Sequence, residues 1–170
     1  ASLVGTASPT SVSAAAVLDH LAKDGCANGT PPLVTVGEGT LLPLAQANIQ
    51  HALAEAGRSG DFDLSLTQFI AHDTDPFAYG AGVAAVLQQQ RVASNIMVGR
   101  FGPELALMVE AASRQAIDQV VGTDDPTALA VATAATDNVL IGEELFATSA
   151  YLEGSASQIA SLQLQDILRW

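Results

Sequence analysis

The order of apolar segments along the chain constrains the fold more than any other feature of this sequence. Short runs of apolar and β-branched residues alternate with longer stretches in which apolar residues recur at helical spacing. This alternation is typical of βα units, in which helices join parallel strands. Each short run is apolar throughout and bounded by Gly, Asp or Asn, as in strands covered on both faces. The predicted strands are residues 33–36, 66–71, 95–98, 119–121 and 139–141.

Helical stretches fill the intervals between these strands, and one more precedes the first strand. Three of them open with proline, whose missing N–H costs nothing there, after Asp75, Gly102 or Asp125 as expected N-caps. Gly25 is expected to end the first helix. The predicted helices span residues 13–23, 40–56, 76–90, 103–115, 126–135, 143–152 and 157–170. We therefore expect a single doubly wound, Rossmann-like α/β domain over the whole chain, with about five mainly parallel strands and helices on both faces.

The charge balance excludes several classes of partner. Eighteen acidic residues face six basic ones, which gives a formal net charge of −12 and a pI of about 4.2. Lys23 is the single lysine, so no basic stripe can neutralise nucleic-acid phosphates or an anionic membrane surface. Cys26 is the single cysteine, which excludes an internal disulfide and predicts a free thiol at the surface.

The apolar composition indicates self-association, and the two ends of the chain indicate that it belongs to a longer protein. Hydrophobic residues make up 49% of the chain and charged residues only 14%, so the helices favour buried or interface-facing surfaces and a homo-oligomer. No stretch reaches the roughly 18 to 20 uncharged apolar residues of a membrane span. The chain opens without Met or a signal-like segment and closes on Trp170, so both ends look cut from a longer protein.

Glycine follows the last residue of four predicted strands, and this recurrence suggests where a ligand could bind. Such glycines permit either a tight βα turn or a close approach of the backbone to a ligand. In an open parallel sheet the ligand crevice lies outside the carboxyl ends of the strands. Two segments, 37–39 and 99–102, resemble parts of glycine-rich phosphate loops, although neither completes such a motif. The candidate ligand-binding residues are Gly37, Gly39, His72, Gly99, Arg100, Gly102 and Gly122.

Acidic residues gather at the same predicted turns. Acids in the first turn of a helix are favoured by the macrodipole, by roughly 0.3 to 1 kcal/mol each, which accounts for most of them without a ligand. The alternative is a divalent-metal site, in which Glu38, Asp73 and Asp75 hold Mg²⁺ through one or two carboxylates. Beyond this Mg²⁺ hypothesis, no cofactor is predicted.

Nucleophilic catalysis finds little support in the sequence. The chain has no Gly-x-Ser-x-Gly elbow and no cluster of His and Cys at zinc spacing. His72 could form an acid–base pair with Asp73 or Asp75, but no partner nucleophile is evident. An enzyme is therefore the less favoured hypothesis.

Several sequence blocks together resemble an uncharacterised family of membrane-anchored bacterial proteins, a domain of unknown function. The most specific blocks are Ile-Gly-Glu-Glu-Leu at residues 141–145 and Gln-Asp-Ile-Leu-Arg-Trp at residues 165–170. These two lie within a larger set of matching blocks, which are residues 31–37, 76–83, 97–105, 140–147, 150–152 and 161–170. The resemblance implies a soluble domain on the cytoplasmic side, with membrane spans outside this chain. It carries no activity and no catalytic residues.

Two functional hypotheses follow from these features. The favoured one is a non-enzymatic binding or interaction domain of a membrane-anchored bacterial protein, which associates with itself and does not bind nucleic acid. Membrane contact is expected only through segments outside this chain. The alternative is a divalent-metal-dependent enzyme or small-ligand binder, with its site at the carboxyl ends of the parallel strands.

Overall fold

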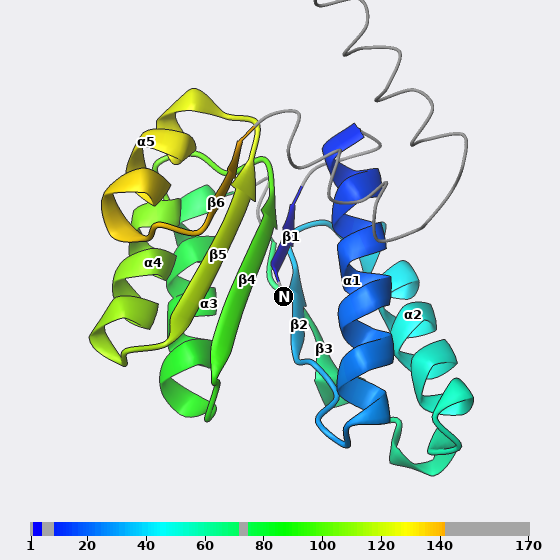
Figure 1. Cartoon of the computed structure of the whole chain (residues 1–170). Coiled ribbons are helices and arrows are strands. Elements are labelled where there is room, and N and C mark those ends of the chain that lie inside the picture. Colours follow the sequence, from blue (N-terminus) through cyan, green and yellow to red (C-terminus); the bar gives the residue numbers. More distant parts are fainter. Residues whose placement is uncertain (1, 5–8, 72–74, 142–170) are drawn as a thin grey trace, which may run out of the picture.

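The structure is a computed structural model, and it describes residues 2–4, 9–71 and 75–141. In this part of the chain, strands and α-helices alternate as the sequence predicts, which confirms the α/β class (Figure 1). Short 3-10 helices at Ser59–Asp61 and Leu64–Leu66 join α2 to β3. The elements are β1 (Ser2–Val4), α1 (Pro9–Ala27), β2 (Val34–Val36), α2 (Leu41–Glu55), β3 (Thr67–Phe69), α3 (Pro76–Gln89), β4 (Ser94–Gly99), α4 (Leu105–Arg114), β5 (Asp118–Thr123), α5 (Pro126–Ala135) and β6 (Val139–Ile141).

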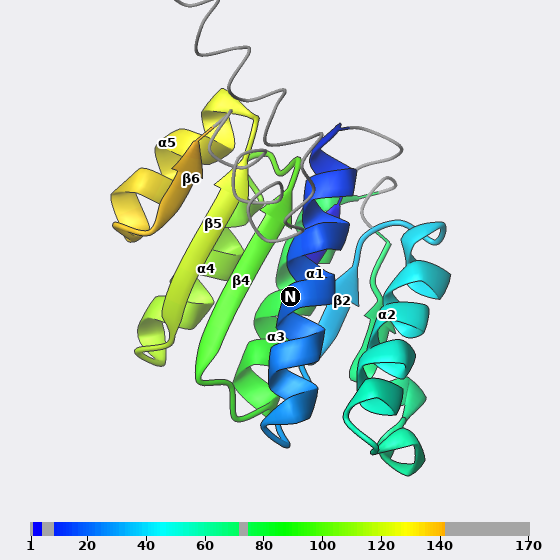
Figure 2. The same cartoon turned by 45° about the vertical axis from the view of Figure 1, so that its right-hand side comes forward.

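The described strands pair in parallel, in the order β3-β2-β1-β4-β5-β6. Strand order therefore reverses between β1 and β4, because the chain builds outward from β1 to β3 and then outward again from β4 to β6. Helices α1 and α2 pack together on one face, and α3, α4 and α5 pack side by side on the other (Figures 1 and 2). Among the described helices, none combines the length and hydropathy that crossing a bilayer requires.

Strand β1 is absent from the sequence-based prediction, which counted five strands and placed the first helix ahead of the sheet. The structure instead places β1 at Ser2–Val4, between β2 and β4. Three residues are too few to show a periodic pattern, and their strand conformation depends on pairing with residues more than thirty positions away. All five predicted strands overlap observed ones.

The helix caps were predicted well where the signal is local. The Asp75 Oδ1 atom accepts hydrogen bonds from the backbone N–H groups of Phe77 and Ala78, at 3.0 and 3.2 Å. The Asp125 Oδ1 atom does the same for Thr127 and Ala128, at 2.8 and 3.1 Å. Both helices begin at the predicted proline, with these aspartates as N-caps.

The predicted boundaries of α4 and α1 are wrong. Helix α4 begins at Leu105 rather than Pro103, and Gly102 is not its N-cap. Helix α1 continues through Gly25 to Ala27. A Cβ atom at Gly25 would lie 2.7 Å from the carbonyl oxygen of Thr30, so glycine is needed there for close packing rather than to end the helix. The predicted helices at residues 143–152 and 157–170 lie outside the described residues.

The hydrophobic core is divided by the sheet into two clusters. One contains Leu18, Ile49 and Val36, from α1, α2 and β2, and the other contains Tyr79 and Met108, from α3 and α4. Cys26 is fully buried in the first cluster, so the expected surface thiol is wrong. Burial raises the pKa of the Cys26 thiol, which Arg58 opposes only in part.

Candidate functional site

The reversal of strand order between β1 and β4 marks the place where a parallel sheet of this kind offers a crevice. We use "carboxyl edge" for the turns after β2, β4 and β5, at residues 37–40, 100–104 and 124–125, together with the first turn of α1. The opposite end of the sheet, where the strands begin, is the "amino edge". Five of the sequence-based candidates lie at the carboxyl edge: Gly37, Glu38, Gly39, Arg100 and Gly102.

At the centre of the carboxyl edge, Arg100, Asp124 and Thr10 form one hydrogen-bonded cluster. The Arg100 guanidinium donates from Nε to Oδ1 of Asp124 at 3.3 Å and from Nη2 to Oδ2 at 3.1 Å. The Thr10 hydroxyl donates to the same Oδ2 atom at 2.8 Å. The cluster therefore joins the ends of β4 and β5 to the first turn of α1. Helix α1 lies on the face of the sheet opposite α3, α4 and α5.

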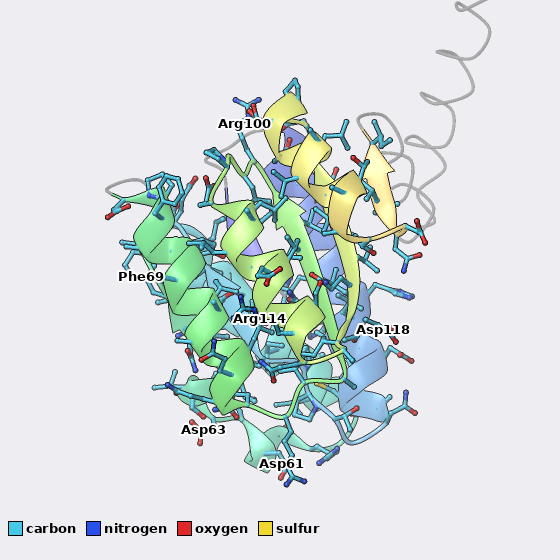
Figure 3. All side chains as sticks on the ribbon, turned by 90° about the vertical axis from the view of Figure 1, so that its left-hand side faces the viewer. Asp61, Asp63, Phe69, Arg100, Arg114 and Asp118 are labelled. Atoms are coloured by element: carbon cyan, nitrogen blue, oxygen red, sulfur yellow. The ribbon has the colours of Figure 1, made fainter. Side chains whose placement is uncertain are left out.

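This cluster leaves Arg100 oriented and accessible. Its side chain is 66% exposed, whereas that of Asp124 is 22% exposed. Nη1 makes no hydrogen bond within the described residues, so the guanidinium retains donors for another group. Figure 3 shows Arg100 at the opposite end of the molecule from Asp61 and Asp63, which confirms that it lies at one extreme of the structure.

The Asp124 carboxylate is held in its ionised form. Burial by itself raises the pKa of this carboxyl group, but hydrogen bonds from Arg100 and Thr10, with the positive charge of Arg100, outweigh it. The pKa of Asp124 therefore lies below its ordinary value of 3.8. Asp124 consequently serves better as a fixed anchor for Arg100 than as a proton donor near neutral pH.

Most other described acids of this region have structural partners. Asp75 and Asp125 cap α3 and α5, as described above. Glu104, which is 1% exposed, accepts a 2.6 Å hydrogen bond through Oε1 from the backbone N–H of Gly102. For these three residues, helix capping and turn formation account for the acid, as the sequence indicated.

The metal hypothesis stays a prediction. His72 and Asp73 lie outside the described residues. Glu38 is buried after β2, whereas Asp75 is exposed and engaged with the first turn of α3. Within residues 2–4, 9–71 and 75–141, no three His, Cys, Asp or Glu side chains are grouped closely enough to hold a metal ion. Binding of Mg²⁺ by Glu38, Asp73 and Asp75 is therefore neither shown nor overturned.

The candidate glycines do not act as one group. Gly99 and Gly122 lie inside β4 and β5 rather than in the turns after them, because both strands run further than predicted. Gly99, with φ 156°, pairs with β1 in a backbone conformation that strains other residues. A Cβ atom at Gly102 would meet Glu104 Oε2 at 2.8 Å, so this glycine serves the turn. Gly37 and Gly39 do lie in the turn after β2, and space around Gly39 is open.

Thr10 is the member of the cluster that sequence reasoning missed. The first helix was predicted to begin at residue 13, whereas α1 begins at Pro9 and Thr10 is almost fully buried in its first turn. Pro9 was the available signal, because proline is favoured in the first turn of a helix and the other proline-initiated helices were found that way.

Comparison with known proteins identifies a family but no activity. A family model described as "Domain of unknown function (DUF6754)" matches residues 3–170. No significantly similar protein was found among curated proteins, and none among solved structures.

Proposed function

The chain belongs to the family described as Domain of unknown function (DUF6754), and we propose that it is a binding domain for a small ligand with phosphate or carboxylate oxygens. We further propose that its sheet is the doubly wound, Rossmann-like type. The strand order, the parallel pairing and the helices on both faces support that assignment. The proposed site is the carboxyl edge, beside the reversal of strand order.

The observation that carries this proposal is the cluster of Arg100, Asp124 and Thr10. Its position at the carboxyl ends of β4 and β5 is the one that ligands occupy in open parallel sheets. The two bonds to Asp124 restrict the guanidinium to one orientation, which lowers the entropy lost when a ligand binds. The remaining N–H donors suit acceptor oxygens, because guanidinium groups bind phosphate and carboxylate groups in two-pronged geometry.

Binding is favoured over catalysis by the state of the described acids. The lowered pKa of Asp124 makes it a poor general acid or base near neutral pH. The carboxylates of Asp75 and Asp125 are engaged with backbone N–H groups at helix starts. These three side chains are therefore better suited to shaping the edge than to transferring protons.

A comparison of two arginine variants tests this proposal. Inorganic phosphate, ADP, NAD and citrate would each be titrated by calorimetry against the unmodified protein, Arg100→Ala and Arg114→Ala. Arg114 is the matched control, because it is also exposed and paired with a carboxylate, Glu110, at 2.7 Å. We expect at least one compound to bind, with a loss of about tenfold or more in affinity for Arg100→Ala only. Equal affinities in both variants, or no binding by any compound, would contradict the proposal.

A second candidate function is protein–protein interaction by a membrane-anchored bacterial protein on its cytoplasmic side. The supporting observations are the sequence resemblance and two exposed aromatic side chains, Phe69 at the end of edge strand β3 at 49% and Phe77 on α3 at 54%. Large exposed apolar side chains are typical of interaction surfaces when they are contiguous. Light scattering on the eluting protein at high concentration tests self-association, and a strict monomer would contradict it for this chain.

A further inference from the structure

The described helices cover one side of the sheet only in part. Helices α1 and α2 lie on this side, where α1 contacts β1 and β4 and α2 contacts β2 and β3. Figures 1 and 2 show β5 and β6 with no described helix in front of them, whereas α4 and α5 lie behind. We call this side of β5 and β6, together with the adjoining part of β4, the open face.

Apolar side chains form the middle of the open face. Successive residues of a strand point to opposite sides, so Val120 lies opposite Val121, which belongs to the core formed with α3 and α4. Val120 is half-buried and belongs to neither core cluster of the described residues. Its partner in β4, Ile96, and Leu140 of β6 are half-buried on the same side. Apolar surface therefore continues across three strands, and its removal from water stabilises the fold.

The open face has the dimensions of one helix. Adjacent strands are about 4.8 Å apart, so β4, β5 and β6 together span about 10 Å. Strand β5 contains six residues and extends about 20 Å. A helix with its side chains is about 10 Å across, and α1 already lies at the border of the open face, over β1 and β4. A single helix beside α1 is therefore sufficient to cover it.

The chain leaves β6 at the border of the open face. Strand β6 ends at Ile141, and residues 142–170 lie outside the described part of the chain. The sequence predicts a helix at residues 143–152, and ten helical residues extend about 15 Å. A connection as short as residue 142 requires this helix to begin beside β6 and to run back along the sheet.

The arrangement of the described elements decides which side of the sheet such a helix can cover. Helix α5 already contacts β5 and β6 on the side opposite the open face. A further helix next to α5 on that side would lie beyond β6, where the described sheet ends. It would have no strand beneath it, so its apolar side chains would stay in water. The open face is therefore the side on which residues 143–152 can bury apolar surface.

The composition of residues 143–152 suits this position. Its two acids lie in the first turn of the predicted helix, where the helix dipole favours them. Its four large apolar or aromatic side chains are Leu145, Phe146, Tyr151 and Leu152. The family model matches residues 3–170, so this segment and the sheet belong to one family unit.

We propose that residues 143–152 form a helix that packs on the open face, beside α1 and antiparallel to β5, and completes the second helical layer. The occupant is this chain's own segment rather than a second copy, because a segment tethered next to β6 has a far higher effective concentration than another molecule. The helix covers Val120 and its neighbours Ile96 and Leu140. The open face is then closed to partners, and self-association must use another surface.

Amide hydrogen exchange in the full chain tests this proposal on the unmodified protein, Val120→Asp and Leu107→Asp. Leu107 is the matched control, because it is also apolar and is 41% exposed, but lies on α4 on the other side of the sheet. In the unmodified protein we expect the amides of residues 147–152 to exchange about a hundredfold or more slowly than in an unstructured peptide.

Val120→Asp should reduce this protection about tenfold or more, because the helix would have to bury a charge, whereas Leu107→Asp should leave it unchanged. Exchange at peptide rates in the unmodified protein would overturn the proposal. Equal protection in the three proteins, or equal losses in the two variants, would overturn it as well.

A photoreactive cross-linker covers the case in which Val120→Asp does not fold. p-Benzoylphenylalanine would replace Asp118, which is exposed on the same side of β5 as Val120, and in the control would replace Thr133 on α5. We expect irradiation to join position 118 to residues 143–152 of the same chain, and position 133 not to reach them. A link between two molecules, a link only to other parts of the chain, or no link from position 118 would overturn the proposal.

Discussion

The two ends of the sheet differ in how their polar groups are satisfied. At the carboxyl edge, Asp124 accepts three hydrogen bonds from Arg100 and Thr10, and Asp125 caps a helix. At the amino edge, Asn95 Nδ2 and Gln119 Oε1 are buried without partners among the described residues. Buried side-chain atoms of Asn95 and Gln119 at the amino edge therefore lack the hydrogen bonds that the carboxylates of Asp124 and Asp125 receive at the carboxyl edge.

Removal of the most buried carboxylate of the carboxyl edge is expected to have the largest effect. Glu104→Ala deprives the N–H of Gly102 of its acceptor at 2.6 Å and leaves a cavity. We expect the free energy of unfolding, measured with urea, to fall by about 2–3 kcal/mol. Glu110→Ala, on the exposed face of α4, the helix that follows Glu104, is the control and should cost less than about 0.5 kcal/mol. Similar losses in the two variants would contradict a structural role for Glu104.

The Asp124 cluster should make stability depend on pH. Because the pKa of Asp124 in the folded protein lies below its ordinary value of 3.8, its stabilisation is complete above that pH and is lost as the pH falls through the folded-state pKa. At pH 7, Asp124→Asn should unfold about 1 kcal/mol more easily than the unmodified protein. This difference should shrink in acid.

Asp118→Asn is the matched control for that measurement, because Asp118 is exposed at the amino edge and its side chain makes no hydrogen bond in the described part of the chain. Urea denaturation from pH 7 down to acid would be run on all three proteins. A difference between Asp124→Asn and the unmodified protein that does not change with pH would show that the carboxylate charge is not what stabilises the cluster.

A substitution at the amino edge is expected to change the free energy of unfolding least, and to raise it rather than lower it. Asn95→Leu replaces a buried donor that lacks a partner by an apolar group of similar shape, so stability should stay within about 0.5 kcal/mol or rise. Asn95→Asp, which places a charge at the same buried position, should lower it. A loss above about 1 kcal/mol in Asn95→Leu would show that Nδ2 already has an acceptor in the protein.

Predictions from the sequence succeeded where the signal and its structural consequence are close together in the chain. Asp75 and Asp125 act on N–H groups two and three residues later, so each cap could be identified from a short segment. The acids of the carboxyl edge were also correctly attributed in part to such caps. Gly99 and Gly122 were misplaced because the ends of β4 and β5 depend on pairing with neighbouring strands, which no local pattern reveals.

The alternation of short apolar runs and helical periods was sufficient to establish the α/β class and the order of most elements, because burial and helix capping act over a few residues. Strand order, the strand at Ser2–Val4 and the open face of β5 and β6 required the folded chain. The cluster of Arg100, Asp124 and Thr10 also required the folded chain, because Arg100 is 24 residues and Thr10 is 114 residues from Asp124 in the sequence. These features arise from packing between distant segments, and that packing leaves no periodic trace in the sequence.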